Sequence, residues 1–259
     1  MTEMSAHSPV VSVEREQAPA PFVLCCEHAS AAIPAGYGDL GLADEARLSH
    51  IAWDPGALGL ARGLAGALDA PLVHAGVSRL VYDLNRPPQA PGAMATRSEV
   101  FDIPGNRDLD ATERQRRTRD LYLPFHARLR ALIADRLATG LPVALVTVHS
   151  FTPVWFGQPR QVELGLIHDA NDRLAVAMLR QAQARTDLTA RLNDPYSAAD
   201  GVAHTLALHA TPMGLPHVMI EVRNDLIATA ETQQAMALRL APCLTAALSE
   251  ITEVTCPTD

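Results

Sequence analysis

Short apolar segments alternate with amphipathic stretches along most of this chain, and this alternation constrains the fold more than any other sequence feature. The apolar segments are brief and rich in β-branched residues, as buried strands are: 21–26, 70–78, 142–150, 161–168 and 215–222. The stretches with helical periodicity are longer: 43–68, 110–139, 170–187 and 228–249. Such alternation predicts a mostly parallel sheet with helices on both faces, the three layers of an α/β fold.

The length of the chain sets the expected number of domains. It has 259 residues, of which 48% are hydrophobic, so it can bury a large core. No Gly/Ser linker, long charge run or internal repeat divides it, which favours a single domain over residues 21–259. Residues 1–20 lack the basic start and apolar centre of a signal peptide, and we expect them to form a flexible leader.

Charge and cysteine content narrow the range of partners. The chain has 21 Lys and Arg against 29 Asp and Glu, and a net charge of -8 disfavours nucleic acid. No apolar run reaches the roughly 18 to 20 residues of a membrane span, so we expect no membrane partner. The four cysteines show no CxxC spacing, which favours a reducing, cytoplasmic compartment. The sequence carries no signal for an oligomeric state.

Three of the apolar segments end in polar residues. His28, His149 and Glu221 stand at these ends, and reacting groups gather at the carboxyl ends of strands in open α/β sheets. Two histidines with neighbouring carboxylates could hold one divalent metal and leave a carboxylate as base. A lone histidine more often caps a strand. For Glu221, however, the apolar HVMI run just before it favours a functional role, because burying an uncompensated carboxylate costs several kcal/mol.

A second group of polar residues follows the segment 70–78. Arg79 is a candidate for stabilising an oxyanion, and Asn85 with Arg86 could grip a carboxylate, since the planar guanidinium suits a bidentate contact. In the alternative interpretation, Arg86 simply pairs with Asp83. Arg223, just after Glu221, is a further candidate for substrate binding.

Five segments together carry a resemblance to a known family. They are CEHASAAIP (26–34), HIAWDPGA (50–57), SRLVYDLNRPP (78–88), TVHSF (147–151) and IEVRNDL (220–226). In this order, across about 200 residues, they resemble the N-formylglutamate amidohydrolase family. That family is similar to zinc carboxypeptidases and aspartoacylase. The resemblance implies a single three-layer α/β/α domain with a mixed, mainly parallel sheet, like that of zinc carboxypeptidases.

The resemblance also implies roles for individual residues. His28 and His149 match metal ligands, zinc being the expected ion, and Glu221 matches the general base. Arg79 matches the arginine that polarises the scissile carbonyl, while Asn85 and Arg86 match the carboxylate clamp. The expected reaction is hydrolysis of an N-acyl acidic amino acid, N-formyl-L-glutamate to L-glutamate and formate.

The carboxylate ligand of the metal is not fixed by the resemblance. Carboxypeptidases take it from a His-x-x-Glu motif, but three residues after His28 stands Ala31. Asp54 and Glu27 are the two candidates. We favour Asp54, because neighbours in an extended strand point to opposite faces, which makes joint chelation by Glu27 and His28 awkward. Alternatively, Asp54 is an N-cap before Pro55.

Three other functions remain open at this stage. A related amidohydrolase of different acyl specificity would need the same metal centre. A carboxylate-binding protein without turnover would keep the arginine clamp, but would not need His28, His149 and Glu221 together. A serine hydrolase would use Ser150 or Ser30, but neither lies in a GxSxG turn.

Overall fold

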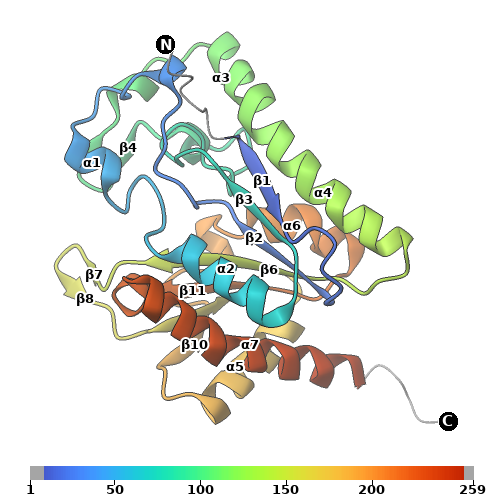
Figure 1. Ribbon diagram of the computed structural model, residues 1–259. Coiled ribbons are helices and arrows are strands. Elements are labelled where there is room, and N and C mark those ends of the chain that lie inside the picture. The colour runs from blue at the N-terminus through green and yellow to red at the C-terminus, as the bar shows by residue number, and fades with distance from the viewer. Residues whose placement is uncertain (1–8, 254–259) are drawn as a thin grey trace, which may run out of the picture.

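A seven-stranded sheet forms the centre of the protein in the computed structural model, which describes residues 9–253 (Figure 1). Its strands are β1 (Val11–Glu14), β2 (Phe22–Cys26), β3 (Leu72–Ala75), β6 (Ala144–Phe151), β9 (Leu164–Ile167), β10 (Ala190–Leu192) and β11 (His217–Arg223). The strand order is β1-β3-β2-β6-β11-β9-β10. β1 and β3 pair antiparallel, as do β11 and β9, and the other pairs are parallel. The predicted mixed, mainly parallel sheet is therefore confirmed.

Helices cover both faces of this sheet. One face packs against α2 (Ala57–Leu68), α5 (Arg173–Arg185) and α7 (Ala230–Glu253), and the other against α4 (Leu123–Ala138) and α6 (His204–His209). Side chains alternate along the strands, so Val146 and Val148 of β6 enter the first core and Leu145 enters the second. The predicted three-layer α/β/α architecture is confirmed.

The predicted helix over 43–68 is two helices in the structure. α1 (Asp44–Leu48) and α2 are separated by a segment that contains Pro55 and Gly56. Gly56 has a φ of +81°, and a Cβ there would come within 2.3 Å of the Ile227 carbonyl oxygen. Only glycine is comfortable in that position. The break matters for function, because it lets the chain pass over the edge of the sheet before α2 begins.

The stretch 110–139 begins with α3 (Ala111–Arg117), which continues through a π-helical turn (Thr118–Tyr122) into α4. Two small hairpins were not predicted. One joins β4 (Arg97–Ser98) to β5 (Phe101–Asp102), and the other joins β7 (Val154–Trp155) to β8 (Gln158–Pro159). Each strand has only two residues, too few to give an alternating pattern in the sequence.

The predicted leader over residues 1–20 is wrong in its second half. Val11–Glu14 form the edge strand β1, in register with β3 from Val11 opposite Ala75 to Glu14 opposite Leu72. The four-residue VSVE segment gives only a weak local signal, and its pairing depends on β3, some 60 residues away. Residues 1–8 of the predicted leader lie outside the described residues. Within residues 9–253, no helix combines the length and apolar character of a membrane span.

Candidate active site

A cleft of about 640 Å³ opens at the carboxyl ends of β2, β6 and β11. The structure brings seven of the eight predicted site residues to it: His28, Asp54, Arg79, Asn85, Arg86, His149 and Glu221. The strand register explains part of this assembly. Glu221 of β11 lies directly opposite His149 of β6, so both side chains point to the same face of the sheet. The rule that placed function at strand ends therefore located the cleft.

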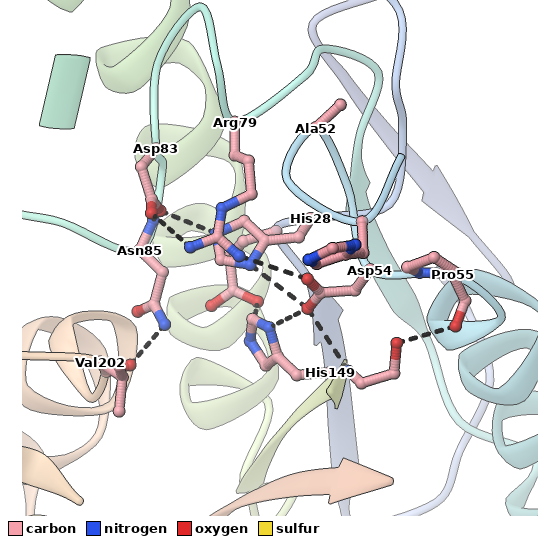
Figure 2. A network of polar contacts seen from close by, with 12 residues as sticks. His28, Ala52, Asp54, Pro55, Arg79, Asp83, Asn85, His149 and Val202 are labelled. Atoms are coloured by element: carbon pink, nitrogen blue, oxygen red, sulfur yellow. Dashed lines mark hydrogen bonds and ion pairs between the residues drawn. The ribbon is translucent and has the colours of Figure 1, made fainter. Parts of the chain in front are cut away.

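Asp54 lies between the two histidines (Figure 2). Its Oδ2 is 2.8 Å from His149 Nδ1 and 3.3 Å from His28 Nδ1. All three side chains are buried. Each offers a ligand atom, and these atoms lie within 4.8 Å of one another. The cluster is a candidate site for one metal ion.

Two more carboxylates hold the far sides of the histidine rings. Asp83 Oδ1 is 2.7 Å from His28 Nε2, and Glu27 Oε2 is 3.1 Å from His149 Nε2. Metal-binding histidines typically donate the second ring N–H to such a partner, which fixes the ring and its tautomer. Here the Nε2 atoms face the carboxylates, so the Nδ1 atoms are left to face Asp54 and each other. The sequence suggested Glu27 as a ligand or as a second choice for the base, and Asp83 as a partner of Arg86.

The geometry and charge of the cluster suit a divalent cation. Atoms bound to one tetrahedral zinc at about 2.0–2.1 Å lie roughly 3.3 Å apart, close to the distances around Asp54 Oδ2. Burial opposes protonation of both histidines, but the carboxylates beside them outweigh it and raise the pKa of His28 and that of His149. The same interactions hold the pKa of Asp54 well below its usual range. The pocket therefore favours positive charge between these side chains.

Asp54 reaches the site because of the break between α1 and α2. Its backbone N–H donates to the His28 carbonyl oxygen at 2.9 Å, which ties the loop to the end of β2. α2 starts at Ala57 with Gly56 as its N-cap, so the alternative of an Asp54 N-cap is not what the structure shows. Glu27, the other proposed ligand, faces His149 from the opposite side and is not in the three-residue cluster.

Glu221 is a buried carboxylate beside this cluster. Its side chain lines the cleft, and its Oε2 has no hydrogen-bond partner among residues 9–253. Burial raises the pKa of Glu221 to about 7, against a smaller opposing effect of His149. A carboxylate with a pKa near neutrality can both accept and return a proton at physiological pH.

Arg79 and Arg86 share Asp83 as a partner. Arg79 donates to Asp83 Oδ2 at 3.1 Å and to Asp54 Oδ1 at 3.3 Å, so it spans the two aspartates (Figure 2). Arg86 Nε is 3.9 Å from Asp83 Oδ2, and its Nη1 donates to the Asp200 carbonyl oxygen. Both pairings leave guanidinium N–H groups available to a ligand, since arginine has five donors.

The side-chain amide of Asn85 makes two hydrogen bonds within the protein, more than predicted. Its Nδ2 donates to the Val202 carbonyl oxygen, and its Oδ1 accepts from the Thr205 N–H at 3.0 Å. These bonds join the Asp83 segment to the loop before α6 and to the first turn of α6. Only the second N–H of the amide is left for a substrate.

Arg223 was predicted to bind substrate, but it is not among the residues that line the cleft. Its guanidinium pairs with Asp225 at 2.8 Å and lies 3.5 Å from Glu163, while Nη1 donates to the Arg160 carbonyl oxygen. The alternation along β11 places Arg223 on the same face as Glu221. Its side chain nevertheless turns toward Asp225 and Glu163 and not into the cleft. The segment IEVRNDL does not indicate this pairing.

These features define a class of protein: an α/β protein with a candidate metal centre and a buried glutamate of raised pKa at the carboxyl edge of its sheet. The chain belongs to the N-formylglutamate amidohydrolase family, because the model of that family matches residues 20–228. This is an amidohydrolase family, as the five sequence segments predicted.

Solved structures share this fold. The gene product Atu2144 from Agrobacterium tumefaciens is 53% identical, with a TM-score of 0.94, and the match covers 96% of this chain and 98% of that one. An N-formylglutamate amidohydrolase from Ralstonia eutropha JMP134 is 19% identical with a TM-score of 0.64, covering 93% and 98%. At that identity the second match shows the fold alone. A search of curated proteins gave no match.

Proposed function

We propose that this protein hydrolyses the amide bond of N-formyl-L-glutamate, releasing L-glutamate and formate, and that it depends on one divalent ion, zinc. The placement of Glu221 next to the His28, Asp54 and His149 cluster is the observation that carries this proposal. Family membership supports the reaction class. The geometry supports the chemistry, because a base of raised pKa stands beside three candidate ligands.

His28, Asp54 and His149 would hold the ion. When bound, such an ion lowers the pKa of water and polarises a carbonyl oxygen. Glu221 takes the proton of the attacking water as the new C–O bond forms at the formyl carbon. It then returns that proton to the amide nitrogen as the C–N bond breaks. No other described residue is needed for proton transfer in this scheme.

Arg79 would stabilise the oxyanion that forms on the formyl oxygen. Its guanidinium is fixed by Asp54 and Asp83, and its side chain is 30% exposed on the cleft side. A donor already fixed in place costs little reorganisation when negative charge develops. The cationic head therefore acts without having to leave its partners.

Arg86 would bind the α-carboxylate of the substrate, with the free N–H of Asn85 beside it. Gly201 makes room for Arg86, because a Cβ there would come within 2.6 Å of Arg86 Nη1. The Asp200 carbonyl oxygen and Asp83 hold the guanidinium at the cleft wall. This arrangement predicts that only free-acid substrates are good ones.

One experiment tests the proposal directly. The purified protein is analysed for metal, and release of L-glutamate is measured on N-formyl, N-acetyl and N-succinyl glutamate. We expect about one equivalent of zinc and a clear preference for the formyl substrate. A faster reaction with another acyl group would keep the enzyme class and change the substrate. Full activity after exhaustive metal removal would refute the metal-dependent mechanism.

A further inference from the structure

A third arginine of the cleft, Arg160, differs from Arg79 and Arg86 in its surroundings. It follows β8 at the base of the β7–β8 hairpin and lines the cleft. Its two side-chain hydrogen bonds go to neutral oxygens, the Thr152 carbonyl at 3.3 Å and the Tyr196 hydroxyl at 3.1 Å. Within residues 9–253, it forms no ion pair. A cleft-lining guanidinium without a carboxylate partner is available to bind an anion.

Three aromatic rings surround the Arg160 guanidinium. Its central carbon lies 4.9 Å from the ring centroid of Trp155, 5.0 Å from that of Tyr196 and 5.4 Å from that of Phe151. These distances are within the range of cation–π contacts, which position a cation while leaving its edge N–H groups free. Two of the five donors are used, and the rest can form a bidentate pair with a carboxylate.

The backbone at Arg160 is also fixed. Its N–H donates to the Pro153 carbonyl oxygen at 2.8 Å, and its carbonyl oxygen accepts from Arg223 Nη1 at 3.1 Å. Arg223, which sequence analysis placed at the substrate, is thus a positioning residue for Arg160. Tyr196, which accepts a hydrogen bond from Arg160, lines the same cleft as Glu221 and Arg79.

We propose that Arg160 recognises the side-chain carboxylate of an acidic N-formyl amino acid, and that Phe151, Trp155 and Tyr196 form the platform that holds its guanidinium. The proposal rests on the proposed function, and adds that the substrate carries two carboxylates held at two different walls of the cleft. Arg86 holds the α-carboxylate, and Arg160 selects acidic over neutral side chains.

The test compares N-formylglutamate with N-formylglutamine, which replaces the side-chain carboxylate by a neutral amide of nearly the same shape. A hydrogen bond to a charged group contributes about 1.5–3 kcal/mol, which corresponds to a factor of roughly 10 to 150. We expect the parent protein to favour N-formylglutamate by this factor in kcat/KM. Arg160→Met should remove the preference by slowing N-formylglutamate alone, leaving N-formylglutamine within about threefold.

Two further variants separate recognition from general effects. Arg160→Lys keeps the charge but not the planar fork, so it should restore only part of the preference. Arg191→Met removes one positive charge from an exposed position of β10, where Arg191 lies 4.0 Å from Asp194, and it should leave both substrates unchanged. Calorimetry of L-glutamate against L-glutamine adds a readout that does not depend on turnover.

The outcomes distinguish the inference from the proposed function. An equal fall for both substrates in Arg160→Met, or equal binding of glutamate and glutamine by the parent, would overturn the role of Arg160. No turnover of either formyl substrate, together with a glutamate preference that Arg160→Met abolishes, would support the carboxylate site and refute the proposed reaction.

Discussion

Removing the charge of Asp54 and removing that of Glu27 should have very different effects on zinc binding. Asp54→Asn replaces a carboxylate that lies 2.8 Å from His149 Nδ1 and 3.3 Å from His28 Nδ1, so it removes a ligand from the centre of the cluster. Glu27→Gln keeps an acceptor for His149 Nε2 and removes only the charge behind the ring. Changes to such outer partners typically cost 10- to 100-fold in metal affinity, about 1.4 to 2.7 kcal/mol. For Asp54→Asn we expect a loss beyond the upper end of that span.

Zinc affinity is measured on metal-stripped protein by competition with a chromophoric chelator at pH 7.5. Asp169→Asn is the matched control, because Asp169 also holds a buried histidine, with its Oδ1 2.6 Å from His217 Nε2, but outside the cleft. It should bind zinc as the parent does. The reasoning would be refuted if Asp54→Asn bound zinc within tenfold of the parent while Glu27→Gln lost it.

Three other predictions concern catalysis and stability. Glu221→Gln should lower kcat by roughly 100- to 10,000-fold with zinc still bound. The parent protein should lose activity as the pH falls through the pKa of Glu221. If the variant kept turnover within a few-fold of the parent, another residue would have to be the base. Arg86→Ala should lower kcat/KM on N-formylglutamate by the equivalent of about 2 to 5 kcal/mol, and Arg86→Lys should restore little of it. If the parent protein hydrolysed N-formylglutamate and its diamide at equal rates, the role of Arg86 would be structural. Burial lowers the pKa of His126 to about 4 and that of His209 to about 3. The unfolded chain binds these protons near pH 6.5, whereas the folded chain does not. The free energy of unfolding, measured in urea, should therefore fall as the pH decreases from about 6.5 to 4, by up to about 1.4 kcal/mol per pH unit for each histidine. His209→Asn should make this pH dependence less steep.

The sequence predicted the strand-end residues well, because two local signals coincide there. Apolar β-branched runs mark buried strands, and the charged or histidine side chains at the end of each run mark the carboxyl end. His28, His149 and Glu221 all satisfy both conditions. Their convergence then follows from parallel pairing, which aligns strand ends at one edge of the sheet.

Residues in loops could not be placed in the same way. Asp54 was ambiguous between a ligand and an N-cap until the positive φ of Gly56 showed where α2 begins. Arg160 and Tyr196 were missed because they meet only through the cleft, 36 positions apart in the sequence. Arg223 was predicted to bind substrate because a sequence does not show that its guanidinium pairs with carboxylates of the protein itself.

Two buried glutamates lie beside His149, and their surroundings shift their pKa values in opposite directions. Glu27 lies 3.1 Å from His149 Nε2, and this interaction outweighs burial and lowers the pKa of Glu27 to about 2. Glu221 lies opposite His149 on β11, but there the effect of burial is larger than the attraction of the histidine and raises the pKa of Glu221 to about 7. Pairs of like groups whose pKa values are pushed apart by their surroundings mark an assignment of roles. Glu27 therefore stays charged beside the histidine ring, whereas Glu221 has the pKa that the proton transfer of the proposed reaction requires.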